Sequence, residues 1–144
     1  MQIGHGGRIW LAAGSAGAAG LVFGVALAKV SYPPLEVLLK TSETTIGQPI
    51  AYPEGVPQVT AAIITMVPGQ ETGWHRHDAP LFAYLLEGEL TVDYGDAGVR
   101  IYREGDAFVE ALKSGHDGTN SGSGEARILA VFMGAEGVAN TVAE

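Results

Sequence analysis

Residues 69–88 read GQETGWHRHDAPLFAYLLEG, and two of the four histidines in the chain, His75 and His77, stand one residue apart within this stretch. Side chains on an extended strand alternate between its two faces, so both imidazoles should point to the same side. A second stretch, GDAFVEALKSGHDGTN at residues 105–120, carries His116. Neutral imidazole is a good ligand for Fe, Zn, Cu and Ni and a weaker one for Mn. The two stretches therefore predict one metal site with three nitrogen ligands.

Short apolar segments separated by turn residues surround these two stretches. In order along the chain, we expect strands at residues 36–41, 59–67, 74–77, 81–87, 89–94, 99–103, 107–112 and 127–133. Strands this short, spaced by turns that contain Gly and Pro, are typical of a β-sandwich or β-barrel. Residues 59–67 are apolar and rich in β-branched side chains, so we expect a buried strand there. Residues 46–57, 114–124 and 134–144 are expected to be mostly loop, and the last of these could pack on the barrel.

The composition of the chain limits its chemistry and its partners. It has 144 residues, of which 47% are hydrophobic, enough to bury the core of one domain. The absence of cysteine excludes thiolate ligands, disulfides and cysteine nucleophiles. The formal net charge is −8, and all 16 acidic residues follow residue 35. Because there is no basic patch to neutralise phosphates, we expect no nucleic-acid partner.

The first thirty residues differ in kind from the rest. Residues 9–28 carry no charge, with Arg8 before the run and Lys29 after it. As a helix, a run of this length spans roughly the 30 Å hydrocarbon core of a bilayer. It also ends in Ala26-Leu27-Ala28, a small-x-small triplet of the kind that signal peptidase cleaves. We therefore expect either an uncleaved single-span membrane anchor or a cleaved signal peptide. A buried helix of the folded domain is disfavoured because the run has no polar face.

Both favoured alternatives place the remainder of the chain outside the cytoplasm, in the periplasm or at an extracytoplasmic face. The predicted organisation is then an apolar helix at residues 1–30 and a stiff proline-containing linker at residues 31–35. An all-β barrel domain follows at residues 36–134, with a tail at residues 135–144. If the leader is not cleaved, residues 9–28 are the contact with the membrane.

The two histidine stretches resemble the paired motifs of the cupin superfamily, whose members are small jelly-roll β-barrels. The residues that match the first motif, G-x5-H-x-H-x3,4-E-x6-G, are Gly69, His75, His77 and Gly88. The residues that match the second motif, G-x5-P-x-G-x2-H-x3-N, are Gly105, His116 and Asn120. The resemblance covers roughly residues 35–134. Within the superfamily, the chain looks most like the small single-domain, quercetin-dioxygenase-like cupins. It implies one divalent transition metal (Fe, Mn, Zn, Ni or Cu) with His75, His77 and His116 as ligands, and it implies a homodimer.

The sequence departs from the cupin pattern at three positions. Leu81 stands where the first motif has its ligand Glu, and Ala111 and Lys113 replace the Pro and Gly of the second motif. The second change alters a turn, whereas the first removes a negatively charged ligand. Thiol dioxygenases of this fold work with three histidines, so the resemblance still implies a metal site at His75, His77 and His116.

Other polar residues near the motifs have competing interpretations. Glu110 is the one acid in the apolar run AFVEAL, so it either faces solvent or is a pocket carboxylate that serves as ligand, positioning group or catalytic base. Arg76 should point away from its two histidine neighbours, and Trp74 should lie on the opposite face of the strand from His75. We expect Asn120 to stabilise a loop by bonding to nearby backbone.

Three functions are compatible with the predicted site. The first is an oxidoreductase, dioxygenase-like, that acts on a small organic substrate held in a largely apolar pocket, with Glu110 as the catalytic base. The second is a non-catalytic module that binds a small ligand or a metal. The third is a cupin with a degenerate site that serves in packing or dimerisation. The fold alone does not decide among them.

Overall fold

A computed structural model of the chain describes residues 33–144, of which Leu35–Glu144 form one compact unit. The predicted apolar helix at residues 1–30 and its role as anchor or signal lie outside the described residues and stay predictions. Within the part of the chain that the structure describes, no helix is long and apolar enough to cross a bilayer.

Nine short strands and one turn of 3₁₀ helix account for the regular structure of residues 33–144. The strands are β1 (Pro57–Met66), β2 (His75–Arg76), β3 (Leu81–Glu87), β4 (Glu89–Asp93), β5 (Val99–Arg103), β6 (Ala107–Val109), β7 (Asp117–Asn120), β8 (Ala126–Ala135) and β9 (Val142–Ala143), and the helix is η1 (Gly95–Ala97). They form a four-stranded sheet in the order β1-β8-β3-β6, a three-stranded sheet in the order β5-β4-β7, and the pair β2-β9.

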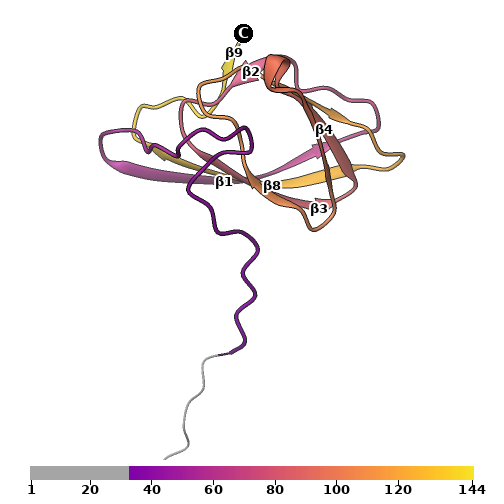
Figure 1. Cartoon of the computed structure of the whole chain (residues 1–144), viewed down its shortest axis with the longest axis horizontal. Helices are drawn as coiled ribbons and strands as arrows, with labels where there is room; N and C mark the ends of the chain where they lie inside the picture. The colour runs from indigo at the N-terminus through magenta and orange to yellow at the C-terminus, as the bar shows by residue number, and fades with distance from the viewer. Residues whose placement is uncertain (1–32) are drawn as a thin grey trace, which may run out of the picture. The chain divides into compact units, whose positions relative to one another are not determined.

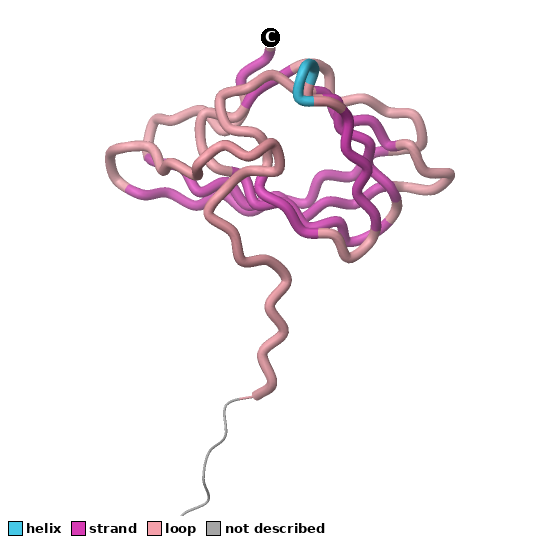
Figure 2. Tube along the Cα trace, in the orientation of Figure 1, coloured by secondary structure: helices cyan, strands magenta, loops and turns pink. Residues whose placement is uncertain are grey.

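The two larger sheets enclose a common core. Figure 1 shows the four-stranded sheet along the lower side of the domain, β4 on the right, and β2 beside β9 at the top; Figure 2 shows the same path as a trace. One buried cluster joins Leu85 of β3 and Ile128 of β8 to Leu90 and Val92 of β4. Burial of these apolar side chains from both sheets is the main term that stabilises the barrel.

Gly88 marks the point where the chain leaves one sheet for the other, between β3 and β4. Its φ is +83°, and a Cβ atom there would lie 2.5 Å from the carbonyl oxygen of Glu125 and 2.9 Å from the Cα of Ala126. Only glycine fits such a contact and such a backbone conformation without displacing β8. The glycine at the end of the first motif is therefore required by the crossing of the chain between sheets.

The predicted strands at residues 81–87 and 99–103 have the predicted bounds, but several other expectations were wrong. Residues 36–41 form no strand, because their side chains are mostly exposed and have no sheet to pair with. The expected loop at residues 114–124 contains β7, which pairs with β4, and the expected loop at the end of the chain contains β9. The strand predicted at residues 107–112 ends at Val109.

The strand predicted at residues 59–67 exists as β1, but the expected burial was wrong. Val59 is 66% exposed and Ile63 is 48% exposed. Within residues 33–144, β1 pairs only with β8, so it is the edge of its sheet. The side chains of Val59 and Ile63 are therefore not packed in the core, whereas Met66 at the end of β1 is buried there.

Candidate metal centre

Three histidine side chains from the two sequence motifs converge inside the barrel. The ring centroids of His75 and His116 lie 4.5 Å apart, those of His75 and His77 4.9 Å, and those of His77 and His116 5.0 Å. One ligand nitrogen from each ring lies within 4.8 Å of the other two. His77 and His116 are buried, and His75 is half-buried.

Backbone hydrogen bonds between the two motifs bring the histidines together. The amide of His75 donates to the carbonyl of His116 over 3.0 Å, and the amide of His116 donates back over 2.9 Å. The amide of Lys113 donates to the carbonyl of His77 over 2.8 Å. These contacts join β2 to the segment before β7, so residues some forty positions apart meet as the barrel closes.

Each imidazole uses its Nδ1 atom to contact a backbone carbonyl. Nδ1 of His75 lies 2.7 Å from the carbonyl oxygen of Gly73, and Nδ1 of His116 lies 2.9 Å from that of Ser114. Nδ1 of His77 lies 2.9 Å from the carbonyl oxygen of Asn140. A carbonyl can only accept, so each Nδ1 carries the proton and each Nε2 keeps a free lone pair. This is the arrangement that metal-binding histidines adopt in other proteins.

The Nε2 atom of His116 is buried and has no hydrogen-bond partner among the described residues. An unpaired buried nitrogen is costly unless a ligand occupies its lone pair. Burial lowers the pKa of His77 to about 4 and also lowers the pKa of His116. Both rings are therefore neutral near pH 7, as metal ligands must be. The donor set fits a divalent transition metal.

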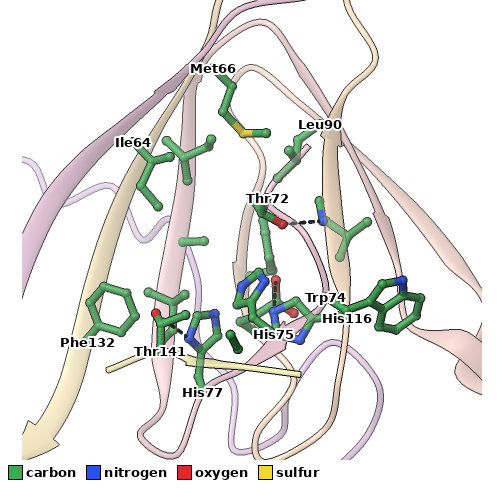
Figure 3. Close-up of a pocket in the computed structure, with 18 residues that line it drawn as sticks. Ile64, Met66, Thr72, Trp74, His75, His77, Leu90, His116, Phe132 and Thr141 are labelled. Carbon is green, nitrogen blue, oxygen red and sulfur yellow. Dashed lines mark hydrogen bonds and ion pairs between the residues drawn. The ribbon is translucent and has the colours of Figure 1, made fainter. Parts of the chain in front are cut away.

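A cavity of about 310 Å³ opens beside the three imidazoles. Its walls are mostly apolar, and Figure 3 shows Ile64, Met66 and Phe132 around it with Trp74 directed away from the rings. The complete lining is Ile64, Met66, Thr72, Trp74, His75, His77, Leu81, Ala83, Leu90, Val92, Phe108, Glu110, His116, Gly118, Ile128, Phe132, Thr141 and Ala143. The cavity lining contains one carboxylate and no Lys or Arg.

The carboxylate in the cavity belongs to Glu110, which follows β6. Its side chain is buried, so the solvent-facing alternative was wrong. One oxygen accepts a hydrogen bond from the amide of Ala111 over 2.7 Å, and the other lies 3.8 Å from Nε2 of His116. Burial raises the pKa of Glu110 to about 6. The set of nitrogens within 4.8 Å of one another leaves Glu110 out, so the carboxylate stands beside the histidine cluster.

The other residues singled out in the two motifs serve the cavity wall or the contacts between strands. Leu81, in the place of the ligand Glu, is buried and forms part of the cavity wall. Arg76 lies outside the cavity lining, as expected, and pairs with Asp78 and Glu144. Asn120 lies in β7, where a loop was expected, and its amide group donates to the carbonyls of Met66 and Gly124. Asn120 therefore ties β7 to the end of β1.

Sequence reasoning missed the contribution of the tail to the site. Asn140 contacts His77 through its main-chain carbonyl, and Thr141 and Ala143 form part of the cavity wall. A main-chain contact requires no particular side chain, and the segment carries no motif. The adjacent β-branched residues Thr141 and Val142 were the one available signal, and it is weak.

Lys113 occupies the position at which the second cupin motif has glycine, and its φ of +55° makes it the one non-glycine residue with positive φ among residues 33–144. An L-residue in this conformation is strained by about 1 kcal/mol. We expect Lys113→Gly to raise the free energy of unfolding by up to about 1 kcal/mol, part of which the greater freedom of glycine in the unfolded chain offsets. Urea denaturation of the two proteins measures the difference, and a clear loss of stability would contradict the strain argument.

The sequence matches the family described as Cupin domain over residues 62–132. No curated protein matches the chain significantly. Among solved structures, an oxalate decarboxylase from Lactobacillus farciminis, in a formate complex, is 23% identical with a TM-score of 0.52; the match covers 59% of this chain and 26% of that chain. An oxalate oxidase is 26% identical with a TM-score of 0.51, over 59% of this chain and 45% of that chain. This chain thus spans less than half the length of either structure.

Proposed function

Because the chain belongs to the cupin superfamily, we propose that it is a metal-dependent oxidoreductase, dioxygenase-like, that uses O₂ to oxidise a small organic substrate. His75, His77 and His116 would hold the metal through Nε2. The observation that carries the proposal is the unpaired, buried Nε2 of His116 within a cluster of three imidazoles that are each oriented by a backbone carbonyl. Such an arrangement has no evident structural purpose without a cation.

The cavity supports an uncharged substrate with an apolar body and a weakly acidic group, such as a phenol or an enol. The two similar structures are enzymes named for oxalate, a small dianion. In this chain a small dianion would face the buried carboxylate of Glu110 and mostly apolar walls, and because the cavity lining holds no Lys or Arg, the proposed metal would be the one positive charge there. Oxalate itself therefore does not suit this cavity.

Each part of the cavity has a role in the proposed reaction. A bound divalent metal would supply Lewis acidity toward the substrate oxygen and, if redox-active, electron transfer. Glu110, with its pKa raised to about 6, is suited to accept the proton of a phenol or enol near neutral pH. Phe108, Ile128 and Phe132 give the substrate apolar contacts and exclude water from the site.

The test is elemental analysis of the purified domain, followed by oxygen-electrode assays with a panel of phenols, enols and thiols. Stoichiometric metal together with oxygen uptake that depends on both metal and substrate would support the oxidoreductase. Stoichiometric metal without turnover on any member of the panel would favour the alternative of a non-catalytic metal- or ligand-binding module. Less than about a tenth of an equivalent of any transition metal would contradict both, since three histidines should retain a metal.

We also propose that the protein is a homodimer that pairs through β1, and the exposed apolar side chains of this edge strand support it. An uncharged edge strand is self-complementary about a two-fold axis. We expect Val59→Lys/Ile63→Lys to convert the dimer to a monomer in analytical ultracentrifugation. A matched control is Val99→Lys/Ile101→Lys on β5, where both side chains are also about half exposed. A monomeric unaltered protein, or equal effects of the two variants, would contradict pairing through β1.

The location outside the cytoplasm remains a proposal that is supported by the uncharged run at residues 9–28. Fractionation of cells that express the full chain tests it. An extracytoplasmic protein whose amino terminus lies near residue 29 would indicate a cleaved signal peptide, and one that stays in the membrane pellet would indicate an anchor.

A further inference from the structure

Residues 140–144, which we call the strap, lie against the histidine cluster. β9 within the strap pairs antiparallel with β2, where Ala143 is opposite His75 and Val142 is opposite Arg76. The amide of Glu144 donates to the carbonyl of Trp74 over 3.1 Å, which extends the pairing by one residue. The strap therefore runs alongside the strand that carries the first motif, as β9 beside β2 in Figure 1.

The strap contributes to the site at two levels. Thr141 and Ala143 form part of the cavity wall, and Figure 3 shows Thr141 beside the ring of His77. Nδ1 of His77 lies 2.9 Å from the carbonyl oxygen of Asn140 and 3.3 Å from the hydroxyl oxygen of Thr141. The orientation of the His77 ring is thus set by the strap.

The three histidines differ in where their positioning carbonyl comes from. His75 and His116 each contact a carbonyl only two residues earlier in the chain, at Gly73 and Ser114. His77 contacts a carbonyl 63 residues later. Two of the imidazoles are therefore oriented by their own loops, whereas the third requires a distant segment to be docked.

We infer that the strap is a positioning segment for the metal site: tight metal binding requires the strap to be docked on β2, and bound metal in turn holds the strap in place. The inference rests on the proposed metal function and adds a structural condition to it. Without the carbonyl of Asn140, the His77 ring can rotate or carry its proton on Nε2, and either change removes a ligand atom. By linkage, metal and docked strap stabilise each other to the same extent.

The contacts that hold the strap are of the kind that open locally without unfolding the barrel. Thr141, Ala143 and Glu144 are exposed, and β9 is only two residues long. The ion pair between Arg76 and Glu144, at 3.3 Å, has both side chains more than a third exposed, so water screens it. Segments with few buried apolar contacts open at a small fraction of the global free energy of unfolding.

The experiment measures Zn²⁺ affinity by competition with a chromophoric chelator. The proteins are the full chain, a chain that ends at Ala139, and Val142→Pro, in which proline removes an amide hydrogen from the β2-β9 ladder. We expect both altered proteins to bind Zn²⁺ about 10- to 100-fold more weakly, the usual effect of removing the group that orients a metal-binding histidine. Glu136→Gln is the matched control, because Glu136 is an exposed residue of the tail before the strap and lies outside the cavity lining, so its Zn²⁺ affinity should equal that of the full chain.

Hydrogen exchange on the full chain gives an independent readout that does not depend on how the variants fold. Zn²⁺ should slow exchange of the amides in residues 140–144, including that of Glu144, and leave those of Val99–Arg103 in β5 unchanged. Equal Zn²⁺ affinity of the folded truncated chain and the full chain, or no change of exchange in the strap, would overturn the inference. Failure of the full chain itself to bind Zn²⁺ would instead contradict the proposed metal function, so the two failures are distinguishable.

Discussion

Replacement of His75 and His77 by alanine together should abolish stoichiometric metal binding, with a residual metal content below about a tenth of an equivalent by elemental analysis. The variant leaves His116 as a single imidazole, which cannot retain a divalent metal against dilution. Since His75 is only half-buried and both residues lie at the cavity, the barrel should remain folded. Removal of His116 alone should weaken affinity by about 100-fold or more, because each ligand contributes several kcal/mol of the binding free energy.

His5→Ala is the matched control for this experiment. It also removes one histidine, but from a part of the sequence with no predicted role in the site, and it should retain the full metal content. Metal retained at one equivalent by the double variant would show that the ion binds elsewhere. In that case the convergence of the three imidazoles would have no bearing on the metal.

Glu110→Gln should lower turnover by about 100- to 10,000-fold on any substrate that the unaltered protein oxidises, because the cavity loses its one carboxylate, the proposed base. The metal content should be unchanged, since the carboxylate stands beside the histidine cluster and the amide has nearly the same shape. Oxygen uptake together with elemental analysis of the same preparation measures both quantities.

Glu87→Gln provides the comparison, because Glu87 is a more exposed acid at the end of β3 and lies outside the cavity lining. It should leave turnover unaltered. Unchanged turnover in Glu110→Gln would exclude the carboxylate as the base. Loss of metal together with activity would instead assign Glu110 as a ligand that takes the place left vacant by Leu81.

The parts of the fold that were predictable from sequence are those in which local pattern and tertiary environment agree. β3 is mostly apolar, β5 is rich in β-branched and aromatic residues, and both lie between turn residues. The bounds of both strands were predicted correctly. β7, with the sequence DGTN, has almost no intrinsic strand preference and exists because β4 offers it a pairing partner. The opposite error occurred at residues 36–41, where a strand-like sequence found no partner.

Burial was harder to predict than strand formation. The composition of β1 is that of a core strand, yet its place at the edge of a sheet is decided by the order of the strands, which its own sequence does not contain. For Glu110 the sequence left a solvent-facing and a pocket position both open, and the topology places the side chain in the cavity. Periodicity predicts which residues share a face of a strand, but not whether that face packs in the core or is exposed to solvent.

The histidine cluster was predictable because spacing along a strand determines the relative directions of side chains. His75 and His77 share a face by strand alternation, and the second motif supplied the third ring. The carbonyl of Asn140 could not be predicted, because every residue has a carbonyl and only the folded chain selects one. The same is true of the positive φ of Lys113, which the turn imposes on a residue that does not favour it.

All three imidazoles are held in direction by peptide carbonyls at Gly73, Ser114 and Asn140, and the one side-chain hydroxyl that contacts a ring nitrogen, that of Thr141 at His77, lies farther away at 3.3 Å. Changes to the side chains of the cavity walls therefore need not disturb how the rings are aimed. During evolution, the residues that determine the substrate can therefore change while the three ligand side chains keep their orientation. Substrate specificity and metal binding can thus change independently of each other, which suits a small scaffold to diversification.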